Sequence, residues 1–328
     1  MRRMHPFATL ARVAAAALLL AAGTAVAAPA IVYDLGGTSD RSFNQAAREG
    51  AERWRAESNT PYLEAQPTDP SQREPMLRAL AERGADPIVV VGFAQKAALE
   101  QVARAFPRLR FAIVDATVDL PNVQSIVFRE HEGSFLVGMM AAIASRTGTI
   151  GFVGGMDAPL IRRFECGYEQ GARHVDPTVT VRAAMAGTTP AAWTDPARGA
   201  ELALAQFAAG ADVVFAAAGP TGLGVYQAAR DAGRLAIGVD VNQNALQPGT
   251  MLTSMIKRVD VAVYRAFTHP LPGSVSLGLK EDGVGYAMDA TNEPLVPPQM
   301  RRRVEAAKAA IIGGSLRVVD YTTRGACR

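Results

Sequence analysis

The stretch Ala30-Ile-Val-Tyr-Asp-Leu-Gly-Gly37 has the pattern of a short buried strand that runs into a pair of glycines. Residues 149–155, Thr-Ile-Gly-Phe-Val-Gly-Gly, repeat this pattern in the second half of the chain. An aspartate follows each glycine pair, Asp40 in the first half and Asp157 in the second. We therefore expect two similar halves, each opening on a strand of its own sheet.

Outward from these two starts, short β-branched runs alternate with amphipathic stretches of helical period, which is typical of a parallel sheet flanked by helices. The expected strands are Ile31–Leu35, Tyr62–Ala65, Pro87–Val91, Phe111–Val114 and Ser125–Phe128, then Thr149–Val153, Thr178–Ala183, Asp212–Ala216, Leu235–Val239 and Met251–Ile256. The expected helices are Phe43–Ala56, Ser71–Arg83, Gln95–Ala105, Glu132–Ser145, Leu160–His174, Pro196–Ala209, Thr221–Ala232 and Pro298–Ile312, with a strand pair at Ser274–Leu279 and Val284–Ala287. The predicted fold is α/β, with two doubly wound parallel-sheet lobes.

No Ser-, Gly- or Pro-rich linker separates the two halves, so we expect short strand-like hinges rather than a flexible tether. The predicted division is a signal peptide at 1–28, a first lobe of 29–128 plus about 258–292, and a second lobe of 129–257 plus about 293–328.

The amino terminus is typical of a cleaved secretory signal. Three arginines precede the apolar run Val13–Ala22, which ends near the small residues Ala25-Val-Ala27. No cysteine follows this segment to carry a lipid, so we expect a free periplasmic protein without a membrane anchor. The leader holds three of the 34 basic residues and none of the 31 acidic ones. The mature chain is therefore formally neutral, and its charge does not favour nucleic acid as a partner.

The two cysteines, Cys166 and Cys327, are expected to form a disulfide, because exported proteins fold in an oxidising compartment. The histidines are scattered, and no metal-binding spacing is present. We expect neither a metal nor a cofactor.

Chemistry-bearing residues follow many of the predicted strands. They are Asp34, Gly36, Gly37, Gly92, Phe93, Asp115, Gly219, Pro220, Thr221, Asp240, Asn242 and Lys257. The carboxyl ends of parallel strands from two facing lobes surround a shared cleft, so these residues are expected to converge there. A carboxylate accepts hydrogen bonds from vicinal hydroxyls or from N–H groups, so a ribose or a nucleobase suits this set and a phosphate does not.

Two aromatic residues, Phe43 and Trp193, stand at helix starts, one in each half. Aromatics in such places commonly pack in the core, but these two are also placed to clamp a flat ring between the lobes. A rival hypothesis is a dinucleotide-dependent enzyme, because Gly219-Pro-Thr-Gly-Leu-Gly224 follows a strand and opens a helix. The glycine spacing differs from G-x-G-x-x-G, and Pro220 removes a backbone donor. Since no catalytic motif is visible, we expect no enzyme activity.

At this point the sequence resembles the basic membrane protein family, the purine nucleoside receptor A-like substrate-binding proteins of ABC transporters. The resemblance covers nearly the whole mature chain and rests on ordered motifs. They are Asp34-Leu-Gly-Gly-Thr-Ser-Asp-Arg-Ser-Phe-Asn-Gln45, Phe111-Ala-Ile-Val-Asp115, Glu132-Gly-Ser-Phe-Leu-Val-Gly138, Gly151-Phe-Val-Gly-Gly155, Trp193-Thr-Asp-Pro196, Gly210-Ala-Asp-Val-Val-Phe215, Ile237-Gly-Val-Asp240 and Leu252-Thr-Ser-Met-Ile-Lys-Arg-Val-Asp260.

The resemblance implies a type I periplasmic-binding fold that closes on a purine nucleoside and delivers it to the permease of an ABC importer. Phe43 and Trp193 match the aromatics that sandwich the base in this family. Asp115 matches a residue at the base edge, and Asp240 with Lys257 matches the pair that holds the ribose. The remaining matched residues that line the cleft are Asp34, Asn44 and Gly219.

Two features depart from the family pattern. Many relatives are lipoproteins, whereas this chain lacks the anchoring cysteine, and Trp193 stands where a smaller aromatic is common. The second departure leaves a free purine base open as the ligand instead of the nucleoside. A sensor that docks on a receptor rather than on a transporter also stays open, and we expect a monomer.

Overall fold

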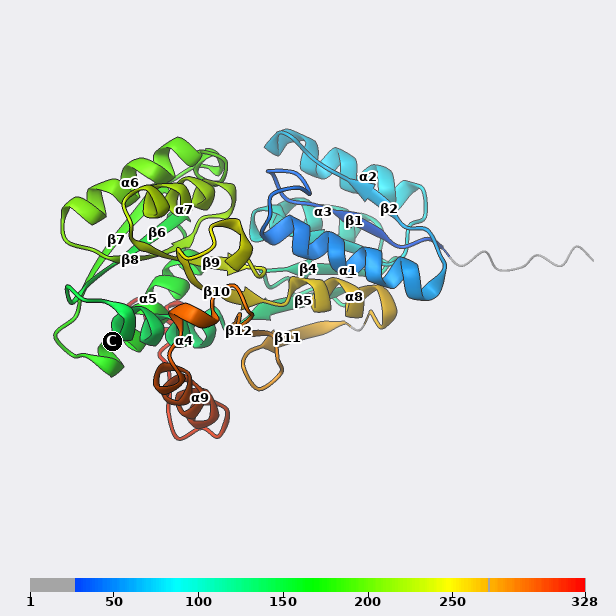
Figure 1. Ribbon diagram of the computed structural model, residues 1–328. Helices are drawn as coiled ribbons and strands as arrows, with labels where there is room; N and C mark the ends of the chain where they lie inside the picture. The colour runs from blue at the N-terminus through cyan, green and yellow to red at the C-terminus, as the bar shows by residue number, and fades with distance from the viewer. Residues whose placement is uncertain (1–26, 271, 328) are drawn as a thin grey trace, which may run out of the picture.

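The computed structural model describes residues 27–270 and 272–327, and these residues form two α/β lobes side by side (Figure 1). The expected signal peptide lies mostly outside the described residues, which begin at residue 27. Within them, no helix combines the length and apolar character that crossing a bilayer requires.

The first lobe is built on a six-stranded sheet of order β11-β5-β4-β3-β1-β2, in which every pair is parallel. Its strands are β1 (Ala30–Val32), β2 (Leu63–Ala65), β3 (Ile88–Val91), β4 (Phe111–Val114), β5 (Val123–Phe128) and β11 (Gly273–Leu277). Its helices are α1 (Phe43–Ser58), α2 (Arg73–Glu82), α3 (Lys96–Ala105) and α8 (Val259–Thr268). Alternate residues of β1 face opposite layers, because Ile31 packs in the cluster with α1 and α8, whereas Val32 packs in the cluster with α2 and α3. This is the doubly wound arrangement that buries both faces of a parallel sheet.

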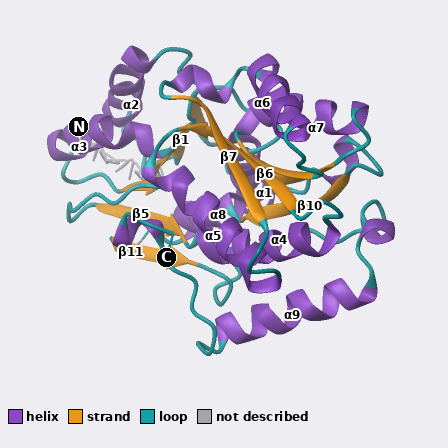
Figure 2. Ribbon diagram, turned by 90° about the vertical axis from the view of Figure 1, so that its left-hand side faces the viewer, coloured by secondary structure: helices purple, strands orange, loops and turns teal. Residues whose placement is uncertain are grey.

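The second lobe repeats this plan on a sheet of order β12-β10-β9-β8-β6-β7. Its strands are β6 (Thr149–Met156), β7 (Thr180–Gly187), β8 (Val213–Ala217), β9 (Leu235–Asp240), β10 (Met251–Lys257) and β12 (Val284–Tyr286). Its helices are α4 (Glu130–Ala144), α5 (Pro159–Val175), α6 (Pro196–Ala208), α7 (Gly222–Asp231) and α9 (Pro298–Ile312), followed by the short α10 (Tyr321–Arg324). Figure 2 shows α9 at the margin of the molecule, packed beneath α4. The predicted fold class is confirmed.

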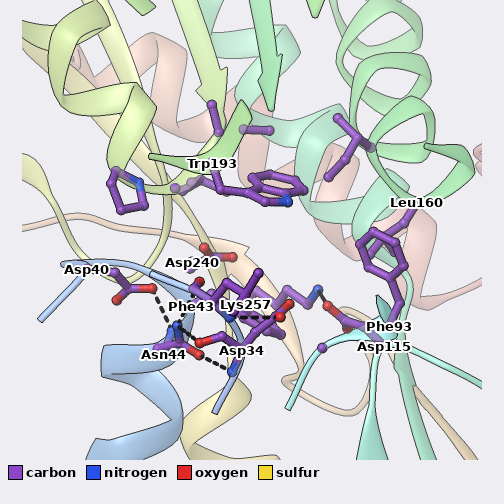
Figure 3. A pocket seen from close by; sticks show the side chains of 18 of the residues that line it. Asp34, Asp40, Phe43, Asn44, Phe93, Asp115, Leu160, Trp193, Asp240 and Lys257 are labelled. Carbon is purple, nitrogen blue, oxygen red and sulfur yellow. Dashed lines mark hydrogen bonds and ion pairs between the residues drawn. The ribbon is translucent and has the colours of Figure 1, made fainter. Parts of the chain in front are cut away.

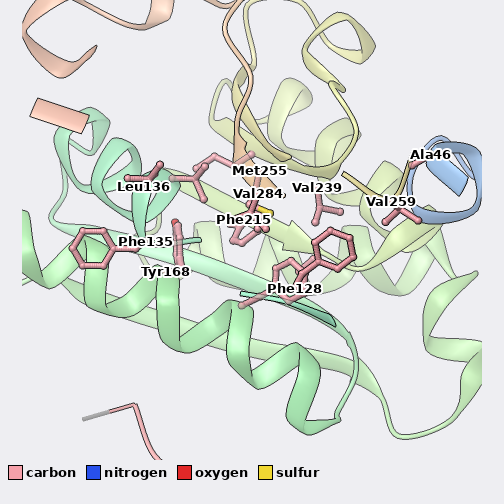
Figure 4. Packing of buried hydrophobic residues seen from close by; sticks show 14 of the residues in the cluster. Ala46, Phe128, Phe135, Leu136, Tyr168, Phe215, Val239, Met255, Val259 and Val284 are labelled. Atoms are coloured by element: carbon pink, nitrogen blue, oxygen red, sulfur yellow. The ribbon is translucent and has the colours of Figure 1, made fainter. Parts of the chain in front are cut away.

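Close helix packing in the second lobe depends on glycines that carry no side chain. A Cβ atom at Gly138 of α4 would collide with the backbone of Tyr168, and one at Gly171 of α5 would collide with the backbone of Phe135. The two helices therefore lie almost backbone to backbone under the sheet. Buried aromatic residues from the second lobe and Phe128 of β5 join in one hydrophobic cluster that spans both lobes (Figure 4).

Two expectations differ from the structure at the carboxyl-terminal end. The segments near 274–279 and 284–287 were expected to pair with each other, but β11 pairs with β5 of the first lobe and β12 pairs antiparallel with β10 of the second. The chain therefore returns to the second lobe between Leu277 and Val284, rather than near residue 292. Two short strands joined by a turn resemble a hairpin in sequence, because the pattern does not show which sheet edge each strand joins.

The chain crosses between the lobes three times, after β5, after β10 and between β11 and β12. A disulfide joins Cys166 of α5 to Cys327, with Cα atoms 4.8 Å apart. The carboxyl-terminal segment is thereby fastened to α5, close to the crossings.

Candidate ligand-binding site

A cavity lies between the two lobes and is lined by residues from both. All eight residues predicted to bind the ligand line it, namely Asp34, Phe43, Asn44, Asp115, Trp193, Gly219, Asp240 and Lys257 (Figure 3). The expected convergence of strand ends therefore places these residues around one space.

Asp115 and Asp240 hold equivalent places in the two lobes. Asp115 follows β4 and Asp240 ends β9, and both have positive backbone φ angles, 71° and 67°. Only a few per cent of residues other than glycine adopt this left-handed conformation, and such strained residues cluster at functional sites. Each lobe thus ends a central strand by turning a carboxylate toward the cleft.

Lys257 forms the centre of a buried charge cluster. Its Nζ lies 2.6 Å from Asp115 Oδ2 and 3.0 Å from Glu130 Oε1, and only 2% of its side chain is exposed. The ring of Phe43 lies 5.2 Å from the same nitrogen. Burial alone would lower the pKa of Lys257, but the surrounding carboxylates outweigh that effect and hold the pKa above its ordinary value. The lysine is therefore a permanent cation at neutral pH.

Asp115 and Asp240 are harder to ionise than exposed aspartates. Burial raises the pKa of Asp240 to about 6, although Lys257 and Ser42 oppose this shift. Burial likewise raises the pKa of Asp115 against the attraction of Lys257. Oδ1 of Asp115 is buried and has no hydrogen-bond partner among the described residues. It is therefore an acceptor that a ligand donor can satisfy.

Asp34 and Asn44 shape the cavity wall by bonding to each other. Asn44 Oδ1 accepts from the Asp34 backbone N–H at 3.0 Å, and Asn44 Nδ2 donates to the Asp34 carbonyl at 3.1 Å. The Asp34 carboxylate accepts from the Leu35 N–H at 2.8 Å and from Arg73 at 3.2 Å. Both polar atoms of the Asn44 side chain therefore bond to the backbone of Asp34, and these bonds fix the loop after β1.

The two aromatics lie on opposite sides of the cavity, Phe43 at the start of α1 and Trp193 at the end of a 3₁₀ turn, Pro190–Trp193 (Figure 3). The indole of Trp193 lies against Gly155, where any Cβ atom would collide with the ring. Gly155, the second residue of the Gly154-Gly155 pair, thus leaves room for the indole ring.

Direct contacts join the lobes beside the cavity. Ser42 of the first lobe donates a hydrogen bond to Asp240 of the second, and Gln243 Nε2 donates to the Arg41 carbonyl at 2.7 Å. With the ion pair between Lys257 and Asp115, these bonds hold the lobes together around the site.

Several lining residues were not among those predicted. They are Leu35, Asp40, Leu160, Ile161, Phe164, Ala217, Ala218 and Val239. Gly92, Phe93 and Pro220 were expected at the cleft because they follow strands, and they line it, whereas Gly36, Gly37, Thr221 and Asn242 do not. Leu160 and Phe164 lie on the apolar face of α5, and in sequence that face cannot be distinguished from core. Asp40 lines the cavity, but its carboxylate accepts three backbone N–H groups at the start of α1, those of Ser42, Asn44 and Gln45.

The chain is similar to known proteins over most of its length. The family model described as "ABC transporter substrate-binding protein PnrA-like" matches residues 28–315. The "ABC transporter nucleoside-binding protein BmpA" of Lactococcus lactis is 34% identical over 318 residues, which covers 88% of this chain and 88% of that protein. An "uncharacterized lipoprotein" of Pyrococcus horikoshii is 36% identical over 274 residues, covering 78% of this chain and 68% of the relative. A solved solute-binding protein of an ABC transporter system from Aeropyrum pernix has a TM-score of 0.81 and 30% identity, with 90% of this chain and 93% of that one covered.

Proposed function

The chain belongs to the Bmp family of PnrA-like ABC transporter substrate-binding proteins, and we propose that its own ligand is a purine nucleoside or the free purine base. The family is one of extracytoplasmic binding proteins rather than enzymes, and such proteins bind small molecules and a transporter permease. We propose that this member works as a free monomer in the periplasm and delivers its ligand to an ABC importer.

One observation carries the proposed ligand class, which is the pairing of aromatic and carboxylate groups around a single cavity. Phe43 and Trp193 lie on opposite sides of the space, as stacking on a flat base requires. Asp115 and Asp240 line the space with carboxylates, and Asp115 Oδ1 has no hydrogen-bond partner among the described residues. Purine N–H groups and ribose hydroxyls are the matching donors.

The charge of the cavity argues against a phosphorylated ligand. Four aspartates line the space, and the cation among the lining residues, Lys257, is already shared between two carboxylates. A phosphate would bring further negative charge into this low-dielectric site and would find no unpaired cation among the described residues that line the cavity. The neutral nucleoside or base therefore fits better than the nucleotide. The printed name of the Lactococcus lactis relative, a nucleoside-binding protein, supports the same ligand class.

Two measurements test the proposal. Protein purified from its native compartment and then denatured should release a purine compound that mass spectrometry can identify. Titration calorimetry of ligand-free protein with guanosine, adenosine, inosine, cytidine and the free bases should show binding of purines in preference to cytidine. Release of a different compound, or binding of none of the purines, would refute the ligand.

A further inference from the structure

Glu130 lies outside the cavity but touches the charge cluster that forms the cavity wall. It is the first residue of α4, immediately after the first crossing between the lobes, and its side chain is fully buried. Its carboxylate contacts two cations of the second lobe, Lys257 at 3.0 Å and Arg163 at 2.9 Å. Burying a carboxylate costs desolvation free energy, so a buried ion pair is weak evidence of a gain in stability. The burial of Glu130 therefore points to a role other than stabilising the fold.

Arg163 is itself fixed from several directions. Its Nη1 donates to the Phe128 carbonyl at 2.9 Å, its Nε to Asp320 at 2.9 Å, and its Nη2 to Thr322 at 2.7 Å. Phe128 ends β5, whereas Asp320 and Thr322 belong to the carboxyl-terminal segment that the disulfide fastens to α5. The position of Glu130 is therefore set by the crossing strand and by the tail together.

We propose that Glu130 is a positioning residue for ligand binding. By attracting Lys257, it prevents the lysine from bonding to both carboxylate oxygens of Asp115, so that one of these oxygens stays free for the ligand. Lys257 contacts Oδ2 of Asp115, whereas Oδ1 has no hydrogen-bond partner among the described residues. Without a second carboxylate, the lysine would pair with Asp115 alone and compete with the ligand for that oxygen. This inference rests on the proposed function, in which Asp115 accepts a hydrogen bond from the ligand.

The charge of Glu130 also acts on the acceptors at a distance. The groups that face it are Lys257, Asp115 and Asp240 on the cavity side, and Arg163, Asp320 and the neighbouring His131 on the tail side. Burial raises the pKa of Asp115 and Lys257 lowers it, and the charge of Glu130 raises it further. Glu130 acts in the same direction on the pKa of Asp240. Removing its charge should therefore let the acceptors stay ionised at lower pH. A purely structural contact would not have this effect.

Three variants separate charge from shape. Glu130→Gln keeps the shape and removes the charge, whereas Glu130→Asp keeps the charge and shortens the reach. Glu165→Gln is the matched control, because Glu165 is a partly buried carboxylate on α5 that pairs with Arg162 at 2.8 Å and does not line the cavity. Each variant is titrated by calorimetry with the purine that binds the wild type, across a pH series, and its fold is checked by circular dichroism.

In Glu130→Gln, affinity at neutral pH should fall about tenfold or more, as expected when a charge-assisted hydrogen bond is weakened. The pH at which binding is lost on acidification should move downward. In Glu130→Asp, affinity should fall while that pH stays in place, and the control should change neither. Loss of affinity by the same factor at every pH in Glu130→Gln, or wild-type binding in that variant, would overturn the inference.

Carbon-13 NMR of the Asp115 carboxyl group in ligand-free protein gives a reading that needs no ligand. Its titration midpoint should be lower in Glu130→Gln than in the wild type, and an unmoved midpoint contradicts the proposal even where the choice of purine has failed. If Glu130→Gln does not fold, Glu130→Asp provides the test, because unchanged ligand affinity in that variant would refute the proposal.

Discussion

Asp240 of the second lobe accepts a hydrogen bond from Ser42 of the first, so one carboxylate both lines the ligand cavity and joins the two lobes. Through this side chain, ligand binding at Asp240 would be coupled to closure of the lobes. A ligand hydroxyl that bonds to Asp240 would add to the same contact region that keeps the lobes together.

Closure should be visible as a change in molecular size. Ligand binding should reduce the radius of gyration, because the lobes are internally packed and are joined by short crossings that can act as hinges. Small-angle scattering with and without saturating purine checks this change in radius. The variant Ser42→Ala should bind the purine more weakly, because it lacks the hydrogen bond to Asp240. An identical radius in both states would mean that the cavity is already formed without ligand.

Acidification should act in opposite directions on binding and on stability. The pKa of Asp240 is about 6 in the folded protein, above the ordinary value of about 4 for the unfolded chain. The folded state therefore takes up a proton between about pH 4 and pH 6, and this group stabilises the ligand-free protein as pH falls through that window. Ligand binding needs the ionised acceptor and should weaken over the same range. Thermal melting and calorimetry at about pH 5 and pH 7.5 test both trends, and Asp240→Asn should flatten the stability trend.

Asp240 and Asp115 should differ in ligand selectivity. Asp240→Ala should weaken nucleosides by about 1.5–3 kcal/mol and leave free bases much less affected, because the lost acceptor serves the sugar hydroxyls. Asp115→Ala should weaken both classes, because it removes the base acceptor and leaves Lys257 with Glu130 as its closest counter-ion. Asp157→Ala is the control, since Asp157 pairs with Arg162 and does not line the cavity. Full nucleoside affinity in Asp240→Ala would exclude its assigned role.

Trp193 should report binding directly. Trp193→Ala should cost about 1–3 kcal/mol of binding free energy if base stacking here resembles that in single-strand binders. The other tryptophan, Trp54, packs edge-on against Phe267, with ring centroids 5.3 Å apart, so a Trp54→Phe variant isolates the Trp193 fluorescence. Gly155→Ala should disturb the indole and weaken binding, whereas Gly285→Ala should not, because a Cβ atom there meets no neighbouring atom. Tryptophan fluorescence that stays constant on saturation would contradict the stacking.

The disulfide should contribute to stability through the long loop that it closes. Its cysteines are 161 residues apart in sequence, for which the chain-entropy relation gives about 5 kcal/mol as an upper figure. Cys327→Ser should therefore lower the denaturation midpoint in guanidinium. Intact mass after alkylation of denatured, unreduced protein should show no modified thiol in the wild type, and two alkylated cysteines would exclude the bond.

Much of this architecture follows from local sequence pattern. The alternation of buried strands and amphipathic helices predicts both lobes, and the helix 298–312 has the predicted bounds. The helix α8 was not predicted as such, although its first residues belong to a motif that was noticed. The partners of β11 and β12 were also missed, because strand pairing depends on edges that only the folded sheets present.

The site residues also fall into two groups, those that local sequence pattern predicts and those that only the folded chain brings together. Residues that directly follow strands were predictable, because parallel topology brings such positions to one edge. Glu130 lies behind the cavity wall, and its importance comes from two cations that lie 33 and 127 positions further along the chain. No local signal marks a residue whose partners are assembled by three crossings of the chain.

Those three crossings also determine the order in which the protein can be completed during synthesis. The helix α8 and the strand β11 of the first lobe are encoded after β6 to β10 of the second, and β12 comes after both. A nascent chain that ends before residue 259 lacks α8, so the small side chains Ala46, Ala47 and Ala51 of α1 have no helix to cover them. Each lobe therefore lacks part of its structure until elements beyond residue 259 have been made, a delay that would help to keep the polypeptide in a translocation-competent form.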